Sequence, residues 1–330
     1  MNNPKITVAI PIYNVEKYIE RCARSLFEQT LQDIEFIFID DCSPDNSVKI
    51  LKDVLKDYPK RQEQTKIISL TKNGGLGNAR TIGVKAATSE YIIHCDSDDW
   101  VDNDLYEKMY NAAIKDNADI VICDCIEEYK NKSILNSNPN FSQDPKEVIA
   151  NAYKYIFWGS LCNKLIKRNL YIDNNIYSYP NISMAEDLGV TCRLFVLANK
   201  LTQIRDSNYH YFRANEKSIT ANKYSDTTIN QMLEVSKLLR DYLLKIDNQR
   251  YEIYANFLCY SSRLQIIRGK FSDLSLYKMT YPETDKYIKY FKYSAFPTKA
   301  RFRFWLVKYK MSFLSIILYK IVMLKSKFFS

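Results

Sequence analysis

The chain has 330 residues, 46% of them hydrophobic and 26% charged, so it can bury a large core and is neither a disordered nor a low-complexity protein. Residues 286–330 carry nine Lys and two Arg but no Asp or Glu, which leaves 36 basic and 38 acidic residues in the rest of a chain whose net charge is +9. A nearly neutral body argues against nucleic-acid binding, and eight scattered cysteines without a Cys-x-x-Cys pair argue against a zinc site.

Strands and helices alternate over the first 124 residues. Hydrophobic runs predict strands at residues 5–10, 34–39, 66–70, 91–95 and 119–123, and helical spacing predicts helices at 15–29, 46–58, 78–87 and 103–115. This order predicts an α/β fold with a mostly parallel sheet and helices on both faces. Pro11 is expected to stop the first strand. The chain starts directly with a strand, so we expect no signal peptide and a cytoplasmic protein with reduced thiols.

Polar residues follow four of the predicted strands. They are the segments 11–14 (Pro-Ile-Tyr-Asn), 40–41 (Asp-Asp), 73–75 (Asn-Gly-Gly) and 96–99 (Asp-Ser-Asp-Asp). Ligands of parallel sheets bind at the carboxyl ends of the strands, so we expect the four segments to face one crevice.

Three carboxylates stand within four positions at the end of the fourth predicted strand: Asp96, Asp98 and Asp99. Like charges this close raise one another's pKa, so a cation should neutralise them. Mg²⁺ commonly takes one or two protein carboxylates and completes its shell with water and phosphate oxygens. A solvated acidic turn that caps the next helix remains the alternative for this segment alone.

The glycine cluster at residues 72–80 (Lys-Asn-Gly-Gly-Leu-Gly-Asn-Ala-Arg) is neither a Walker loop nor a dinucleotide fingerprint. A helix that starts there offers free N–H groups to an anion, with Arg80 as a diphosphate partner. The alternative is a flexible turn followed by a solvated arginine.

Taken in order, the motifs between residues 5 and 220 resemble those of the inverting, nucleotide-sugar-dependent glycosyltransferases of family 2, which have the GT-A fold. The matching segments are 11–14, 29–30, 40–45, 73–75, 79–80, 96–100, 163–165, 185–187, 209–213 and 218–219. The resemblance is greatest to bacterial enzymes of lipopolysaccharide or capsule synthesis, including β-1,3-galactosyltransferases. Thr81 departs from the Asn that is frequent in the family, and we expect it to be structural. His94 replaces a more usual apolar residue, and we expect a hydrogen-bonded strand histidine rather than a catalyst.

The resemblance implies a role for each donor-side residue. Pro11, Tyr13 and Asn14 would shape the base and ribose pocket, Asp41 would accept from the N3–H of uracil, Arg80 would meet the diphosphate, Asp96 and Ser97 would contact the ribose or sugar, and Asp98 and Asp99 would hold Mn²⁺ or Mg²⁺. Such a cation stabilises the charge that develops on the leaving diphosphate.

The resemblance also implies a general base, because inversion needs no covalent nucleophile. Asp187, at the start of a predicted helix, is the expected base, although an isolated Glu-Asp pair there would be read as a helix cap. Glu186 is expected to support it or to bind acceptor. His210 would contact the diphosphate or metal, or hydrogen-bond structurally. Trp158 would stack on a sugar, or pack at the core edge.

We expect residues 1–220 to form the catalytic domain, with a donor half (1–124) and an acceptor half (125–220). Residues 221–295 are expected to be a helical extension, and residues 296–330 a basic amphipathic tail. The longest uncharged run near the end is nine residues, 311–319, against about 20 needed to span a bilayer. The tail should therefore lie on an anionic membrane surface, or else pack on the body with its lysines in water.

These expectations describe a metal-dependent enzyme at the inner face of the cell membrane. It would transfer a hexose or N-acetylhexosamine, carried on UDP, to a saccharide or lipid-linked saccharide in surface polysaccharide or lipopolysaccharide synthesis. The alternative is a non-catalytic carbohydrate- or partner-binding module on a degenerate transferase fold.

Overall fold

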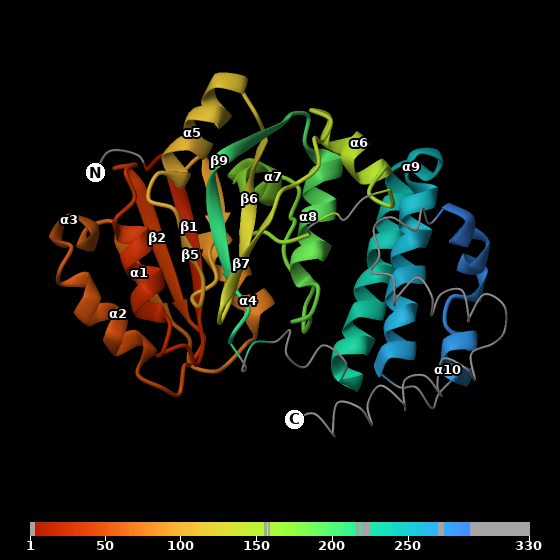
Figure 1. The fold of residues 1–330 in the computed structure, drawn as a ribbon, viewed down its shortest axis with the longest axis horizontal. Helices are drawn as coiled ribbons and strands as arrows, with labels where there is room; N and C mark the ends of the chain where they lie inside the picture. The colour runs from red at the N-terminus through yellow and green to blue at the C-terminus, as the bar shows by residue number, and fades with distance from the viewer. Residues whose placement is uncertain are drawn as a thin grey trace. The chain divides into compact units, whose positions relative to one another are not determined.

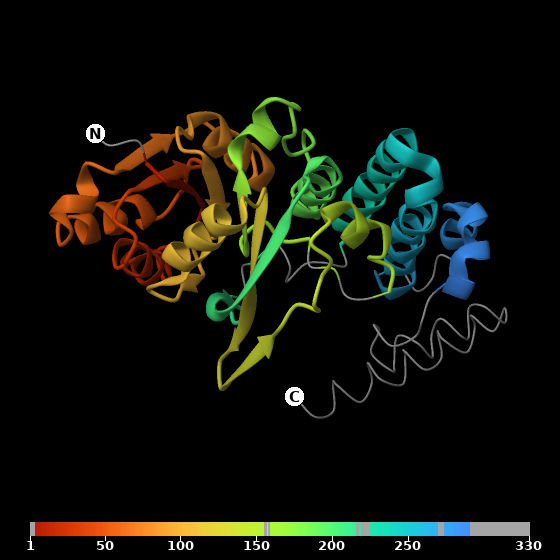
Figure 2. The same ribbon diagram turned by 90° about the horizontal axis from the view of Figure 1, so that it is seen from above.

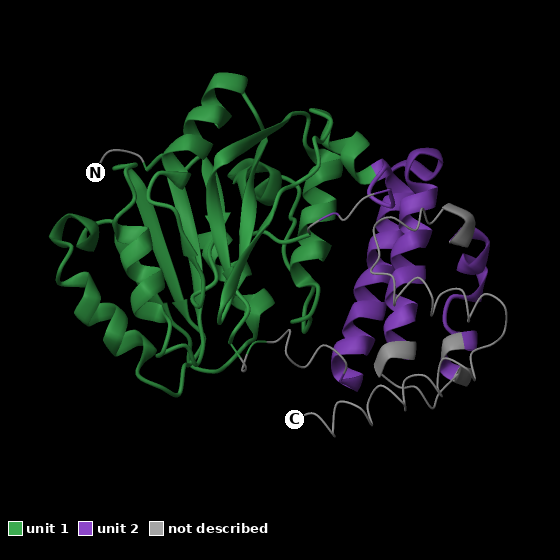
Figure 3. Cartoon of the chain, in the orientation of Figure 1, with its two compact units in different colours: residues 1–149, 158–221 green, residues 150–157, 222–330 purple. Residues whose placement is uncertain are grey.

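The computed structural model describes residues 4–154, 157, 159–215, 218, 225–269 and 274–290. The chain divides into two compact units, the first made of residues 1–149 and 158–221 and the second of residues 150–157 and 222–330 (Figure 3). The predicted tail, residues 296–330, lies outside the described residues.

The first unit is built on one nine-stranded sheet in the order β3-β2-β1-β4-β8-β6-β9-β5, with β7 paired to β6 (Figure 1). The strands are β1 Ile6–Ile12, β2 Ile34–Asp40, β3 Thr65–Ser69, β4 Tyr91–His94, β5 Trp100–Val101, β6 Ile120–Tyr129, β7 Lys132–Asn136, β8 Lys164–Lys167 and β9 Leu201–Phe212. The first four strands pair in parallel, as predicted, and β8 joins β4 in antiparallel fashion. The β6–β7 hairpin extends from the rest of the first unit (Figure 2).

Helices cover both faces of this sheet. They are α1 Ile19–Phe27, α2 Ser47–Leu55, α3 Pro59–Gln62, α4 Leu76–Ala86, α5 Leu105–Asp116, α6 Pro145–Ala150, α7 Arg168–Ile172 and α8 Glu186–Leu197. Side chains alternate along a strand, so Val8 and Ile10 share one core with α1 and α5, whereas Ala9 faces α4. Gly83 of α4 lies so close to β1 that an added Cβ would stand 2.8 Å from the Cβ of Ala9.

The first strand continues through Pro11, contrary to the prediction that proline would stop it. The pairing of β1 with β4 ends at Ala9 and His94, where the Ala9 carbonyl accepts a hydrogen bond from the N–H of Cys95. The backbone nitrogen of Pro11 points toward β4, as that of Ala9 does, but β4 no longer pairs with β1 at this position. The missing N–H of the proline therefore removes no hydrogen bond between the two strands.

The second unit is helical where it is described. It contains α9 Asp226–Gly269, which is interrupted at Asp247 by an extended backbone (φ −158°), α10 Leu274–Met279 and the 3₁₀ helix η2 Pro282–Tyr290. The 3₁₀ helix is joined to α9 by the hydroxyl of Tyr287, which donates to Glu252 at 2.6 Å. Within the described residues, no helix combines the length and the apolar character needed to cross a membrane.

Candidate active site

A cavity of about 420 Å³ lies at the carboxyl ends of β1, β2 and β4. The predicted donor-site residues that line it are Pro11, Tyr13, Asn14, Asp41, Asp96, Ser97 and Asp98. The four polar segments that follow the strands therefore meet at one crevice, with Asn73 and Gly75 contributed by the glycine cluster. Parallel pairing explains this, because it places the carboxyl ends of β1, β2 and β4 at the same edge of the sheet.

The glycine cluster binds a side chain of the protein. The N–H groups of Gly74 and Gly75 donate to the two carboxylate oxygens of Asp41 at 2.7 and 2.9 Å. Gly75 has φ +83°, a conformation that favours glycine, and directly precedes α4. The helix start in this cluster was expected to offer free N–H groups to an anion, and the anion that Gly74 and Gly75 bind is the carboxylate of Asp41, which they orient at the wall of the cavity.

Arg80 is buried rather than solvated, and it does not line the cavity. Its Nη1 donates to Glu186 Oε1 at 2.5 Å and its Nη2 to Asp96 Oδ1 at 2.7 Å. Burial disfavours its charge, but Asp96 and Glu186 outweigh that effect and raise the pKa of Arg80 above its ordinary value. The structure thus corrects the prediction of a diphosphate partner: Arg80 joins the acid at the end of β4 to the acid that begins α8.

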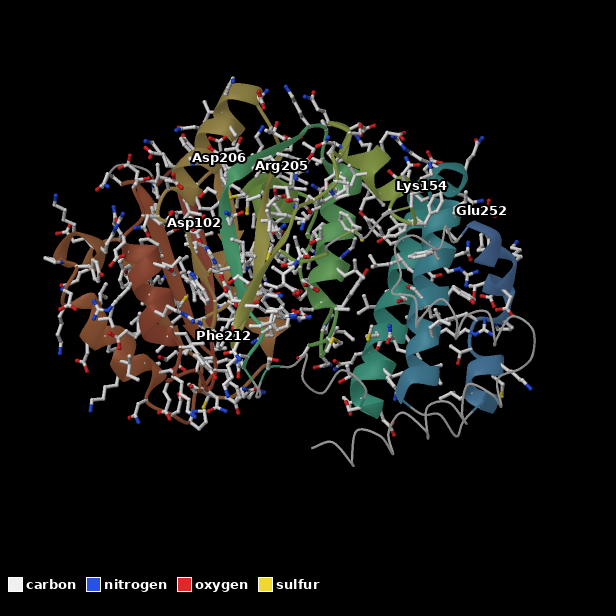
Figure 4. The ribbon with its side chains drawn as sticks, in the orientation of Figure 1. Asp102, Lys154, Arg205, Asp206, Phe212 and Glu252 are labelled. Carbon is white, nitrogen blue, oxygen red and sulfur yellow. The ribbon has the colours of Figure 1, made fainter. Side chains whose placement is uncertain are left out.

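Asp98 lines the cavity, whereas Asp99 is hydrogen-bonded to strand β9. Asp99 is fully buried, and its two carboxylate oxygens accept hydrogen bonds from the Tyr209 hydroxyl at 2.5 Å and from the Phe212 N–H at 2.7 Å. Phe212 is the last residue of β9 (Figure 4). Both oxygens are engaged with β9, so the predicted metal role of Asp99 is corrected to that of an anchor between the acidic segment and this strand.

Asp98 lines the cavity and accepts a hydrogen bond from Asn215 Nδ2 at 2.7 Å. Burial, with the nearby charge of Asp96, raises its pKa to about 6. Behind it, Arg21 Nη2 donates to the Asp98 carbonyl at 2.8 Å, and the Arg21 guanidinium lies 3.7 Å from the centre of the Trp100 ring. Both the carboxylate and its backbone are therefore held in place.

The cavity suits a hard cation that takes some of its ligands from the protein and the others from a bound substrate. In the described part of the chain, no group of three His, Cys, Asp or Glu side chains is arranged to hold a metal. The oxygen donors of Asp98 fit Mg²⁺ or Mn²⁺, which can take their remaining ligands from water and phosphate. A metal bound here would depend on the phosphates of a ligand in the same cavity.

Asp187 lies in the first turn of α8, beside the network of Arg80 but not among the residues that line the cavity. Burial raises the pKa of its carboxyl, and the positive charges of Arg80 and Lys164 oppose that rise. Lys164 is itself buried, which lowers its pKa to about 8, and its Nζ donates to the Ser160 carbonyl at 2.6 Å. An acid with a raised pKa next to two cations has the electrostatic surroundings of a general base.

Glu186 is buried and ion-paired with Arg80, so it supports the network. His210 does not line the cavity. Its Nε2 lies 2.9 Å from Asp102 and its Nδ1 2.8 Å from Glu128, and its ring stacks on that of Trp100. This is the structural alternative for His210 rather than a contact with diphosphate or metal. Trp158 lies outside the described residues.

Two further sequence expectations have clear outcomes. The hydroxyl of Thr81 donates to the Gly77 carbonyl one helical turn earlier at 2.8 Å, which is a structural role. His94 is buried, and neither ring nitrogen has a hydrogen-bond partner among the described residues, so no described protein group makes the hydrogen bond expected of this strand histidine.

Four polar residues that line the cavity were given no role from the sequence: Ser183, Tyr211, Asn215 and Ser218. Tyr211 and Ser218 belong to segments that match the family pattern, and Ser183 lies just before Glu186, so position along the chain was a usable signal for these three. Asn215 gave no such signal, because its significance depends on its contact with Asp98.

Comparison with known proteins adds three similarities. Residues 7–186 match the family described as Glycosyl transferase family 2. The chain is 31% identical to the uncharacterized glycosyltransferase EpsJ of Bacillus subtilis over 227 residues, which are 67% of this chain and 64% of EpsJ. It is 32% identical to the poly(ribitol-phosphate) beta-glucosyltransferase of Bacillus spizizenii over 210 residues, which are 63% of this chain and 32% of that protein. The chain therefore spans less than two thirds of the length of these curated relatives.

The fold is similar to that of S. aureus TarS 1-349, solved in complex with UDP-GlcNAc. The TM-score is 0.62 at 22% sequence identity, over 87% of this chain and 79% of that chain. At this identity the similarity concerns the fold, and the predicted GT-A architecture with a helical C-terminal region is confirmed.

Proposed function

The chain belongs to glycosyl transferase family 2, and on that premise we propose that it transfers a hexose or N-acetylhexosamine from a UDP-sugar to a saccharide acceptor, with inversion at the anomeric carbon. The observation that carries the proposal is the single cavity at the carboxyl ends of β1, β2 and β4. Asp41, held by two glycine N–H groups, and Asp98, held by Asn215, line the same 420 Å³.

The donor is assigned to this cavity by the chemistry of its walls. Pro11, Tyr13 and Asn14 border the space for a base and ribose, and Asp41 accepts from the N3–H of uracil, a contact that cytosine cannot make. Asp96 and Ser97 lie next to the ribose or sugar. Asp98 would hold a Mn²⁺ or Mg²⁺ ion, and such an ion would supply positive charge to stabilise the leaving diphosphate.

Asp187 is the proposed general base. It takes the proton from the acceptor hydroxyl as that oxygen attacks the anomeric carbon, opposite the departing diphosphate. Arg80 and Lys164 favour the ionised carboxylate that this step needs, while burial keeps the pKa raised and the group basic. Arg80 also ties Glu186 to Asp96, which fixes the start of α8 against the donor side.

The acceptor is proposed to be a surface polysaccharide or a lipid-linked saccharide, in keeping with the polymer named for the Bacillus spizizenii relative. The predicted basic tail, residues 296–330, would hold the enzyme on the anionic inner face of the cell membrane, since each Lys or Arg near such a surface contributes about 1 kcal/mol. Removing residues 302–330 should abolish sedimentation with anionic liposomes. Unchanged sedimentation would remove the membrane proposal and leave the catalytic one intact.

A thermal-shift screen of UDP-, GDP- and dTDP-sugars with and without Mn²⁺ tests the donor. We expect stabilisation by UDP-sugars that requires Mn²⁺ and is lost in Asp98→Asn. Sugar release or transfer from the stabilising donor then separates an enzyme from a non-catalytic sugar-binding module. Equal shifts for all three nucleotides, independent of the metal and of Asp98, would contradict the proposal.

A further inference from the structure

A second, much smaller cavity lies behind the ion network of Arg80. It is lined by side chains from α4, β4 and α7, among them Arg80, His94 and Tyr171, together with apolar residues such as Val190. Its volume is about 10 Å³, which is about the space that one buried water molecule requires. The cavity is therefore of the right size for one water and too small for an organic ligand.

Four polar atoms of residues that line this cavity share an unusual property. Arg80 Nε, the Tyr171 hydroxyl and both ring nitrogens of His94 are buried and have no hydrogen-bond partner among the described residues. A buried polar group left unpaired destabilises the folded state, and nearly all such groups in proteins are paired with protein or ordered water. Three residues from three separate elements, each with an unpaired polar atom beside one cavity, point to a common partner inside it.

The hydrogen-bonding capacities of the three residues identify that partner. Arg80 Nε–H can only donate, the Tyr171 hydroxyl can do both, and a neutral His94 has one donor nitrogen and one acceptor nitrogen. Burial and the charge of Arg80 lower the pKa of His94 to about 3, so its ring is neutral near neutral pH. A water molecule can accept from Arg80 and donate to His94 and Tyr171, which makes the three bonds typical of a buried water. A cation would be repelled by Arg80.

We propose that this cavity binds one structural water molecule that links Arg80 to His94 and Tyr171, and that His94 is thereby a positioning residue for Arg80. The guanidinium is held by Glu186 at Nη1 and by Asp96 at Nη2, and the water holds it at Nε. With all three sides fixed, the guanidinium cannot rotate away from either acid. The effect of the water on turnover rests on the proposed function, but its binding does not.

The proposal explains why a histidine occupies this position of β4. The other residues of the strand, Tyr91, Ile92 and Ile93, are buried and hydrophobic, and an aliphatic side chain would fill the same space without an unpaired ring nitrogen. If His94 only packs in the core, replacing it with leucine should remove two unpaired atoms and leave the protein equally or more stable. If His94 holds the water, the same change should destabilise the protein.

A double-variant cycle on stability tests this difference. We expect His94→Leu and Tyr171→Phe each to lower the midpoint of urea unfolding, and the double variant to lose clearly less than the sum, because either change alone releases the shared water. Additive losses, or a stabilised His94→Leu protein, would overturn the proposal.

Tyr106→Phe is the matched control. Tyr106 is also buried with a hydroxyl that has no partner among the described residues, but it packs with Ile93 and Cys95 on the opposite face of β4 from His94. Its combination with His94→Leu should therefore be additive. Coupling of the same size for Tyr106 would show that the cycle measures general core effects and would overturn the proposal.

A crystal structure that resolves ordered water should show density within hydrogen-bonding distance of Arg80 Nε, His94 and Tyr171, and clear absence of that density would overturn the water site. With UDP-GlcNAc and Mn²⁺ as probes, we expect His94→Leu to lower kcat about tenfold with little change in KM, and His94→Gln to recover part of it because its amide can still bind water. An equal loss in both variants would contradict the positioning role. Density and coupling without any sugar transfer would leave the water site standing and contradict only the proposed function.

Discussion

The two sides of the catalytic region hold their acids by different means. On the donor side, Asp41 is oriented by the backbone N–H groups of Gly74 and Gly75, which carry no net charge. On the base side, Glu186 and Asp187 lie among the full charges of Arg80 and Lys164. The difference suits the two proposed roles. Neutral donors would keep Asp41 an acceptor for the uracil base, whereas charged neighbours would set how readily Asp187, as general base, takes up a proton.

The largest effect is expected where the chemistry itself is removed. Asp187→Asn should lower kcat by about 10²–10⁴-fold, because the amide cannot accept the acceptor proton, with the midpoint of unfolding little changed. Asp173→Asn, an exposed acid after α7, is the control and should keep full activity. A variant with most of the wild-type kcat would remove Asp187 as the base.

The next effect concerns the charged network of the base side. Arg80→Met should lower the free energy of unfolding by about 3–5 kcal/mol, because it leaves the buried Glu186 and the half-buried Asp96 without their partner. Arg24→Met serves as the control: Arg24 is exposed and pairs with Glu20 and Asp57, so its loss should hardly change the urea midpoint. Equal stability of the two variants would show that the buried ion pairs of Arg80 do not stabilise the fold.

A smaller effect is expected on the donor side. Asp41→Asn exchanges one acceptor oxygen for an NH₂ group, so one of the two glycine N–H groups loses its partner, at about 1–3 kcal/mol of stability. Calorimetry should show weaker binding of UDP with kcat at saturating donor nearly retained. A fall in kcat with unchanged UDP affinity would mean that Asp41 serves the base side instead.

The smallest effect is a shift in a pH profile. Burial raises the pKa of Asp187, and a base must be ionised, so kcat/KM should fall about tenfold per pH unit as the pH drops below that pKa. Lys164→Met removes a positive charge that opposes the rise, so the acidic limb should move to higher pH. A limb that stays in place, or that persists in the residual activity of Asp187→Asn, would assign it to another group.

The donor side could be predicted from the sequence because its residues follow hydrophobic strands directly. The strands, their parallel pairing and the meeting of their polar ends all depend on local patterns. Even so, the extension of β1 through Pro11 depended on where β4 stops, and no pattern within β1 contains that information.

The contacts between distant residues could be predicted only in part, on the donor side as well as on the base side. Asp98 and Asp99 are neighbours in sequence, yet one faces the cavity and the other is bound by Tyr209 and Phe212, more than a hundred residues away. The sequence predicted Arg80 to be a ligand for phosphate, but in the structure it donates hydrogen bonds to Asp96 and Glu186. Periodicity identifies the buried face of an element, but it does not specify which partner a buried charge will find.

The position of Arg80 depends on how closely Gly83 of the same helix packs against the sheet. It lies three residues after Arg80 in α4, almost one turn along the same helix, where only the missing methyl group lets α4 rest against Ala9 and Ile39. We expect any side chain there to push α4 away from the sheet and to weaken both ion pairs of Arg80 together. The link between the end of β4 and the start of α8 thus depends on a methyl group that is missing from the hydrophobic interior.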